Sequence, residues 1–153
     1  MTAVYYEDIE VGETQEFGEY TVTKDEILEF AEQYDPQPFH VDEAAAEDSP
    51  FGELIASGWH TASICMRLLV RGPLGDQAGM GARGVDELRW HQPVKPGDTL
   101  SIRTEVLDKR PSKSAPDRGY VDSRLTGINV DDEPVISWIG LGMVARRPDA
   151  DAE

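Results

Sequence analysis

Residues 57–70, with the sequence SGWHTASICMRLLV, form the stretch on which the predicted fold depends. Apolar and small side chains would occupy most of the circumference of a helix built from this stretch, and Arg67 is its one charged residue. Helices with such a pattern are buried on most sides. We therefore expect a central helix that the rest of the chain has to cover.

The chain after this helix changes from helical spacing to strict alternation. Apolar and polar residues alternate around Leu88 and Trp90, and again from residue 100 to 106, as is typical of half-buried strands. We expect further strands at 14–21, 120–130 and 135–145. The glycine-rich segment 71–84 and the polar segment 110–119 are predicted to be loops.

A curved antiparallel sheet wrapped around one long central helix satisfies this order of elements. We therefore predict a single α+β domain of the hot-dog type over residues 1–147, followed by a disordered acidic tail at 148–153. A chain of 153 residues is long enough for one core of this kind without disulfides or metals.

A short amphipathic helix is expected before the central one. Thr23 and Glu26 have the spacing of a capping box, and apolar residues recur at helical spacing as far as Tyr34. Pro36 disfavours a helical conformation at Asp35, which would leave this carboxylate just beyond the negative end of the helix dipole. We therefore expect the pKa of Asp35 to be raised. Asp42 is expected to cap a further brief helical turn.

The segment DPQPFH, residues 35–40, places a carboxylate and an imidazole five residues apart, with two prolines between them. Asp35 and His40 held in this way could share one water molecule and move its proton near neutral pH. The alternative is a proline-rich surface turn. Gly58 favours catalysis, because unobstructed amides at a helix start can stabilise a developing oxyanion; a glycine needed only for close packing is its alternative.

The composition excludes several classes of partner. The 30 acidic residues outnumber the 14 basic ones, for a net charge of -16, and such a surface repels nucleic acid and anionic membranes. No apolar run approaches the ~20 residues that cross a bilayer, and the acidic first residues do not resemble a leader, so we expect a soluble cytoplasmic protein. Cys65 has no metal-ligand spacing with the histidines and is expected to be a buried apolar residue.

The segment 35–42, followed by Phe51-Gly52 and by residues 55–58, resembles the signature of MaoC-like dehydratases and (R)-specific enoyl-CoA hydratases. The resemblance extends over nearly the whole chain. It implies addition of water to a trans-2-enoyl thioester, or the reverse, with Asp35 and His40 as the acid–base pair and the Gly58 amide as the oxyanion donor. It also implies a homodimer with the substrate tunnel between the protomers.

The same resemblance implies that coenzyme A enters only as part of the acyl-CoA substrate, and that no metal or redox cofactor is needed. Gln37 replaces a more usual Asn and Ser57 replaces a frequent His. We expect Gln37, Phe39, Ser57 and Trp59 to contact the substrate, and we expect His60 and His91 to be packing or surface histidines.

One later stretch holds six basic residues that could bind the coenzyme A phosphates or only balance nearby acids: Arg103, Lys109, Arg110, Lys113, Arg118 and Arg124.

Two other functions compete with hydration. A hot-dog acyl-CoA thioesterase typically uses a carboxylate on the central helix, and residues 59–70 contain neither Asp nor Glu. A non-catalytic acyl-thioester-binding or scaffold subunit would not need an acid–base pair, and the presence of both Asp35 and His40 argues against it.

The high acidic and low lysine content predicts adaptation to concentrated salt, because salt screens the repulsion among like charges. We expect the free energy of unfolding to rise steeply between about 0.1 M and several molar NaCl, as denaturant titrations at each salt concentration would show. A stability that does not change over this range would contradict the prediction.

Overall fold

The computed structural model describes residues 2–148, so the predicted tail lies outside the described residues except for Pro148. The elements in chain order are η1 (Tyr6–Asp8), β1 (Thr14–Thr21), α1 (Lys24–Tyr34), α2 (Pro38–Val41), α3 (Glu43–Glu47), α4 (Gly58–Arg71), β2 (Gly79–Trp90), β3 (Thr99–Pro111), β4 (Arg118–Ile128) and β5 (Pro134–Ala145).

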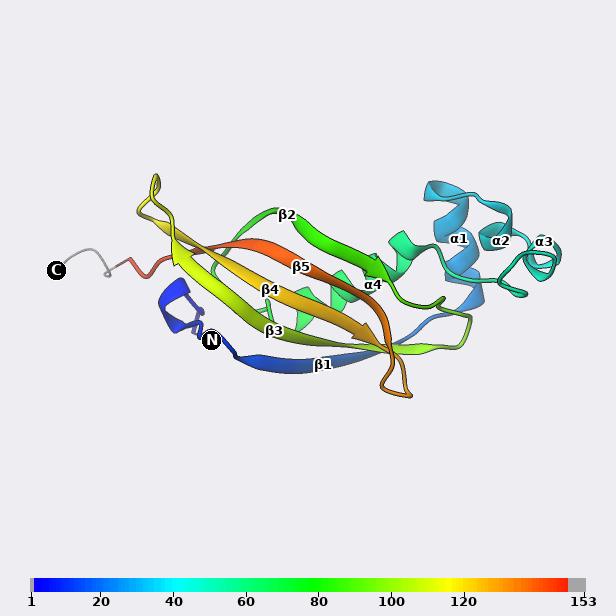
Figure 1. The fold of residues 1–153 in the computed structure, drawn as a ribbon, viewed down its shortest axis with the longest axis horizontal. Coiled ribbons are helices and arrows are strands. Elements are labelled where there is room, and N and C mark those ends of the chain that lie inside the picture. Colours follow the sequence, from blue (N-terminus) through cyan, green and yellow to red (C-terminus); the bar gives the residue numbers. More distant parts are fainter. Residues whose placement is uncertain (1, 149–153) are drawn as a thin grey trace.

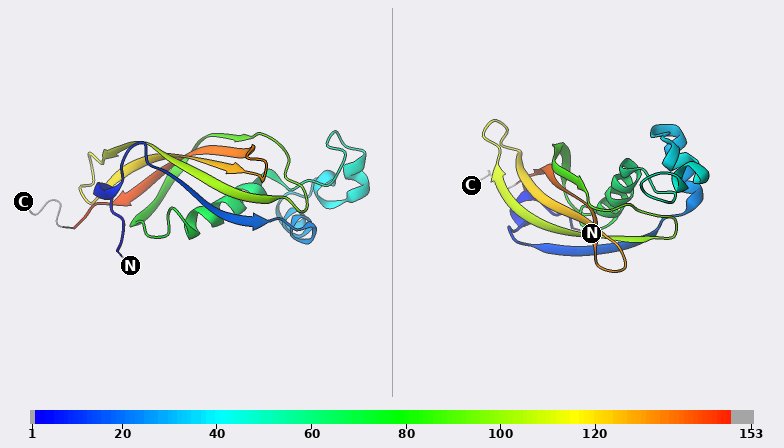
Figure 2. Two further views of the ribbon diagram at one scale, coloured as in Figure 1. Left: turned by 90° about the horizontal axis from the view of Figure 1, so that it is seen from below. Right: turned by 45° about the vertical axis from the view of Figure 1, so that its right-hand side comes forward.

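The five strands form one antiparallel sheet in the order β1-β3-β4-β5-β2. Figure 1 shows α4 running along this sheet, with α1, α2 and α3 gathered beyond one end of it. In Figure 2 the sheet curves around the side on which α4 lies. This is the hot-dog arrangement that the order of elements predicted.

The core lies between α4 and the concave face of the sheet. Ile64, Cys65 and Leu68 point inward from α4, and Leu100 and Ile136 meet them from β3 and β5. Full burial of each large aliphatic side chain contributes on the order of 1.5–3 kcal/mol. The burial of Cys65 in this cluster confirms its predicted role as an apolar core residue.

The outer side of α4 is not buried within this chain, contrary to the prediction of a helix covered on most sides. Trp59, Met66 and Val70 are 55%, 43% and 52% exposed. The reason is geometric: the sheet curves around only one side of the helix. The exposed Val85 and Trp90 lie on β2, an edge strand of the sheet, and we call these five residues the apolar strip.

Two predicted loops are partly strand. Residues 79–84 belong to β2, in which Gly81 has a positive φ of 94° and the pairing register with β5 shifts three times. Pairing with β5 therefore overrides the low strand propensity of these glycines, at the cost of a bulged ladder. The polar loop shrinks to residues 112–117, because β3 and β4 pair as far as Pro111 and Gly119.

The helix α1 ends at Tyr34, as predicted, and Thr23 caps it by accepting a hydrogen bond from the Glu26 amide at 3.2 Å. The expected return bond from the Glu26 carboxylate does not form in the described chain. That carboxylate instead accepts a hydrogen bond from the Tyr20 hydroxyl at 3.0 Å and lies 3.9 Å from Nε2 of His60. None of the helices within residues 2–148 is long and apolar enough to cross a membrane.

His60 links α4 to α1 and is a packing histidine, as predicted. Its ring is buried and stacks on Phe30, with ring centroids 4.7 Å apart and planes 9° from parallel. Burial lowers the pKa of His60 below its ordinary value of 6.5, and the nearby Glu26 carboxylate only partly opposes this shift.

A histidine with a lowered folded-state pKa makes stability depend on pH. The unfolded chain binds a proton at residue 60 as the pH falls through 6.5, while the folded chain resists protonation. The stability that the neutral His60 contributes to the folded chain is therefore present above pH 6.5 and is lost as the pH falls below it. We expect the free energy of unfolding to fall less between about pH 7.5 and pH 5 in His60→Gln than in the wild type.

Denaturant titrations across this pH range would measure the difference. Equal slopes in His60→Gln and the wild type would contradict the assignment.

Candidate functional site

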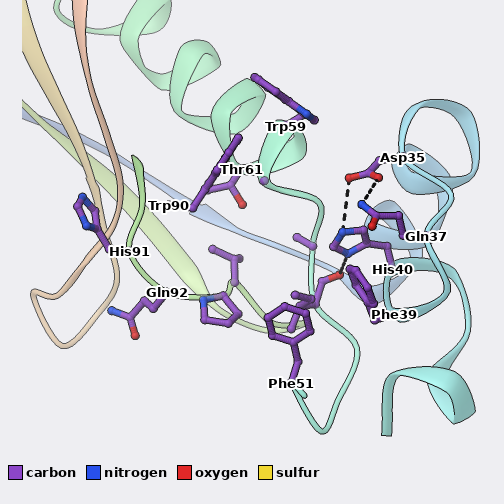
Figure 3. Close-up of a pocket in the computed structure, with 15 residues that line it drawn as sticks. Asp35, Gln37, Phe39, His40, Phe51, Trp59, Thr61, Trp90, His91 and Gln92 are labelled. Carbon is purple, nitrogen blue, oxygen red and sulfur yellow. Dashed lines mark hydrogen bonds and ion pairs between the residues drawn. The ribbon is translucent and has the colours of Figure 1, made fainter. Parts of the chain in front are cut away.

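The carboxylate of Asp35 and the imidazole of His40 face each other across a sharp turn between two helices. Asp35 follows α1, donates its amide to the Ala31 carbonyl at 2.9 Å, and leaves the helical region with φ -156° and ψ 66°. Pro38 begins α2, the short helix that carries His40. The turn brings Asp35 Oδ2 to 3.4 Å from His40 Nε2 (Figure 3).

A hydrogen bond at the far side of the ring determines the tautomer of His40. Its Nδ1 lies 2.8 Å from the carbonyl oxygen of Ile55. Because a carbonyl oxygen can only accept, Nδ1 carries the hydrogen, and in the neutral ring Nε2 presents a lone pair. The buried imidazole therefore directs a hydrogen-bond acceptor toward Asp35.

Two donors hold the Asp35 carboxylate. Ser57 Oγ donates to Oδ2 at 2.7 Å, and Gln37 Nε2 donates to Oδ1 at 2.7 Å. Burial raises the pKa of Asp35, but the hydrogen bonds from Ser57 and Gln37 and the nearby His40 outweigh it, so the pKa lies below its ordinary value. The predicted increase is wrong, because the helix end that would raise the pKa acts more weakly than two direct donors.

The start of α4 leaves one backbone amide without a partner. Ser57 is the N-cap and its Oγ accepts from the Trp59 amide at 3.2 Å, while the amides of His60 and Thr61 donate to the Ser57 carbonyl. Within the described chain, the Gly58 amide has no recorded hydrogen-bond partner. It is therefore the first-turn donor that remains available for a ligand.

Both interpretations of Gly58 fit the structure. A Cβ atom at this position would lie 2.4 Å from the Trp90 indole, so close packing also requires a glycine here. Gly58 also lines the cavity, as an oxyanion donor would. Its role as an oxyanion donor remains a prediction.

A cavity of about 480 Å³ brings the acid–base pair and the Gly58 amide together. Trp59 and Trp90 form one wall as an edge-to-face pair with centroids 5.1 Å apart, and Phe39 and Phe51 form another, 5.2 Å apart. Figure 3 shows the two tryptophans beside α4 and the acid–base pair beside α1 and α2.

The predicted substrate contacts divide into two groups. Gln37, Phe39 and Trp59 line the cavity, whereas Ser57 is fully buried and its hydroxyl contacts Asp35 instead. The lining also includes Trp90, Gln92 and the exposed His91, which were not predicted as site residues. Their only signal in the sequence was strand alternation, which says nothing about proximity to Asp35.

The six basic residues between 103 and 124 do not line this cavity in the described chain. Arg103 pairs with Glu16 and Asp132, and Arg110 lies 3.2 Å from Asp108. Arg118 pairs with Asp117, and Arg124 lies 3.7 Å from Glu105. Lys109 donates a hydrogen bond to the Tyr6 carbonyl, and Lys113 lies on the loop 112–117. The paired residues balance nearby acids, and binding of the coenzyme A phosphates by this stretch remains a prediction.

Asp42 is a helix cap, as predicted. Its carboxylate accepts from the Ala44 amide at 2.9 Å at the start of α3. No group of three or more His, Cys, Asp or Glu residues within residues 2–148 is arranged to hold a metal ion.

Solved structures of two similar proteins match most of this chain and most of their own length. A MaoC-like dehydratase from Rhodospirillum rubrum is 43% identical, with a TM-score of 0.87 over 95% of this chain and 99% of that one. An R-hydratase from Pseudomonas aeruginosa is 26% identical, with a TM-score of 0.73 over 95% and 88% of the two chains.

Among curated proteins, a 3-hydroxybutyryl-CoA dehydratase from Methylorubrum extorquens is 31% identical, over 99% of this chain and 90% of that protein. The family described as "MaoC like domain" matches residues 8–126, which include the acid–base turn, the start of α4 and most of the sheet. The chain therefore belongs to the MaoC-like dehydratase family.

Proposed function

We propose that this protein is a hydro-lyase that adds water to a trans-2-enoyl-CoA to give a 3-hydroxyacyl-CoA, or catalyses the reverse reaction. The observation that carries the proposal is the meeting of three groups in one cavity. These are the Asp35 carboxylate, the lone pair of His40 Nε2 at 3.4 Å from it, and the unpartnered Gly58 amide.

Two facing acceptors are suited to hold one water molecule. Water can donate one O–H to Asp35 Oδ2 and the other to His40 Nε2, which leaves an oxygen lone pair free to attack the β-carbon of the enoyl group. The water oxygen forms the new bond to the β-carbon, and the π electrons move toward the thioester. A proton is then added to the α-carbon on the same face.

The lowered pKa of Asp35 divides the work between the two side chains. A carboxylate with a lowered pKa is a poor proton acceptor, whereas the lone pair on Nε2 of His40 is free to accept a proton. In this mechanism, His40 takes the proton from water and returns it to the α-carbon, while Asp35 holds the water. The Ile55 carbonyl, which accepts from Nδ1, stabilises the imidazolium that forms transiently.

The Gly58 amide would hold the thioester oxygen as negative charge develops there. It lies at the positive end of the α4 dipole, where its hydrogen bond is strengthened as the charge grows. Because the thioester itself acidifies the α-carbon, this mechanism assigns no step to a metal or redox cofactor, and coenzyme A enters as part of the substrate. Gln37, Phe39 and Trp59 remain proposed substrate contacts.

Replacement of either member of the acid–base pair tests the mechanism. In Asp35→Asn and His40→Gln we expect the rate of hydration to fall by at least ~100-fold, the scale of a lost positioned acid or base. Crotonyl-CoA is the first substrate to test, because a four-carbon acyl-CoA is named for a relative. Loss of absorbance from the conjugated enoyl thioester, measured in high salt, follows the reaction.

Asp42→Asn is the matched control, because Asn caps a helix as well as Asp does and residue 42 does not line the cavity. Undiminished hydration in both site variants would contradict the mechanism. Release of free coenzyme A thiol in the same assay would favour the thioesterase instead. Binding of acyl-CoA without either reaction in the wild type would favour a non-catalytic subunit.

We also propose that a second copy of this chain covers the apolar strip. Trp59 and Trp90 belong both to this strip and to the cavity wall, so a copy seated there would complete the substrate tunnel. β2 is an edge strand, and an edge with exposed apolar side chains is suited to pair with another chain. A cytoplasmic location remains a prediction.

We expect light scattering in high salt to give the mass of a dimer. Met66→Glu should shift the protein toward monomer, because a buried, unpaired carboxylate opposes association. Val130→Glu, at a residue that is 77% exposed on the β4–β5 hairpin, is the matched control and should remain dimeric. A monomeric variant with full activity would contradict the shared tunnel.

A further inference from the structure

We propose that Ser57 is a positioning residue that couples the acid–base turn to the oxyanion end of α4. This inference rests on the proposed hydration reaction for its catalytic consequence, but its structural part does not. The residue was expected to contact substrate, yet its hydroxyl does not reach the cavity and instead joins two elements of the site.

The hydrogen bonding of Ser57 determines how the hydroxyl is oriented. Its oxygen accepts from the Trp59 amide at 3.2 Å, and its single hydrogen points to Asp35 Oδ2 at 2.7 Å. An ionised carboxylate can only accept, so the direction of both bonds is settled. Because Ser57 is fully buried, water does not readily replace either partner.

The bond to Asp35 acts on the oxygen that faces the imidazole. Ser57 holds Oδ2, which lies 3.4 Å from His40 Nε2, while Gln37 holds Oδ1 from an exposed position. Ser57 thus fixes the rotation of the carboxylate from the buried side. It keeps Oδ2 ionised and directed toward the point where one water would bridge the pair.

The bond to Trp59 acts on the other half of the site. An N-cap hydroxyl satisfies one of the unpaired amides in the first turn of a helix, and here it satisfies that of Trp59. The carbonyl of the same residue accepts from the amides of His60 and Thr61. Ser57 thus accepts hydrogen bonds from the three amides that follow Gly58, and the Gly58 amide stays available to donate to a ligand.

Ser57→Ala tests this coupling with two independent readouts. We expect kcat for enoyl-CoA hydration to fall about 10- to 100-fold, the scale of one hydrogen bond to a charged group, with little change in KM. We also expect the carboxyl carbon of Asp35, followed by NMR in protein with 13C-labelled aspartate and assigned with Asp35→Asn, to titrate at a higher pH. Loss of the Ser57 hydrogen bond removes one cause of its lowered pKa.

Thr23→Ala is the matched control for the loss of a helix cap. Thr23 caps α1 through the same kind of hydroxyl-to-amide bond and does not contact Asp35. Thr23→Ala should lower the melting temperature as Ser57→Ala does, while the pH at which Asp35 titrates and the kcat for hydration stay near the wild-type values. Ser57→Thr keeps the hydroxyl and should restore both readouts.

An Asp35 titration that does not move in Ser57→Ala would overturn the proposal, whatever happens to the rate. A loss of kcat no greater than that in Thr23→Ala would also overturn it, because cap loss alone would then explain the effect. If the wild type hydrates no enoyl-CoA, the proposed function fails, and the NMR titration still decides whether Ser57 controls Asp35.

Discussion

The burial of one side of α4 against the concave face of the sheet is the constraint on which the rest of this structure depends. Ile64, Cys65 and Leu68 direct that side inward, and the curvature of the sheet closes over it. Once this face is buried, the start of the helix is fixed at the end of the molecule where α1 and α2 gather. The candidate site lies at this junction, where Gly58 from α4 and the pair Asp35 and His40 line one cavity.

The electrostatics of the cavity follow from which groups are donors and which are acceptors. The Ile55 carbonyl sets the tautomer of His40, and the donors Ser57 and Gln37 keep Asp35 ionised. The result is a pair of acceptors in a cavity that Gly58 also lines, and this set of groups is suited to activate water and to stabilise charge on a carbonyl oxygen. Membership of the MaoC-like dehydratase family agrees with this chemistry.

Most elements could be predicted because their signals are local. Helical spacing and the Thr23 cap define α1, and the two prolines define the turn between Asp35 and His40. The errors arose where distant contacts override local preference. Glycines around Gly81 are poor strand formers, yet β5 draws them into β2. The apolar outer side of α4 predicted burial, but one chain supplies a sheet for only one side of the helix.

The sequence by itself determined the central helix, most of the strand segments and the turn between Asp35 and His40, because periodicity and proline restrict the backbone within a few residues. Only the tertiary structure decided which side chains from distant segments meet. Ser57 lies far from Asp35 in the chain but 2.7 Å from it in space, and this contact helps to lower a pKa that the local helix end alone was expected to raise. Trp90, which is distant in the chain, likewise packs against Gly58 from the strand β2. Hydrogen bonds and packing depend on distances in space, and spacing along the chain does not record them.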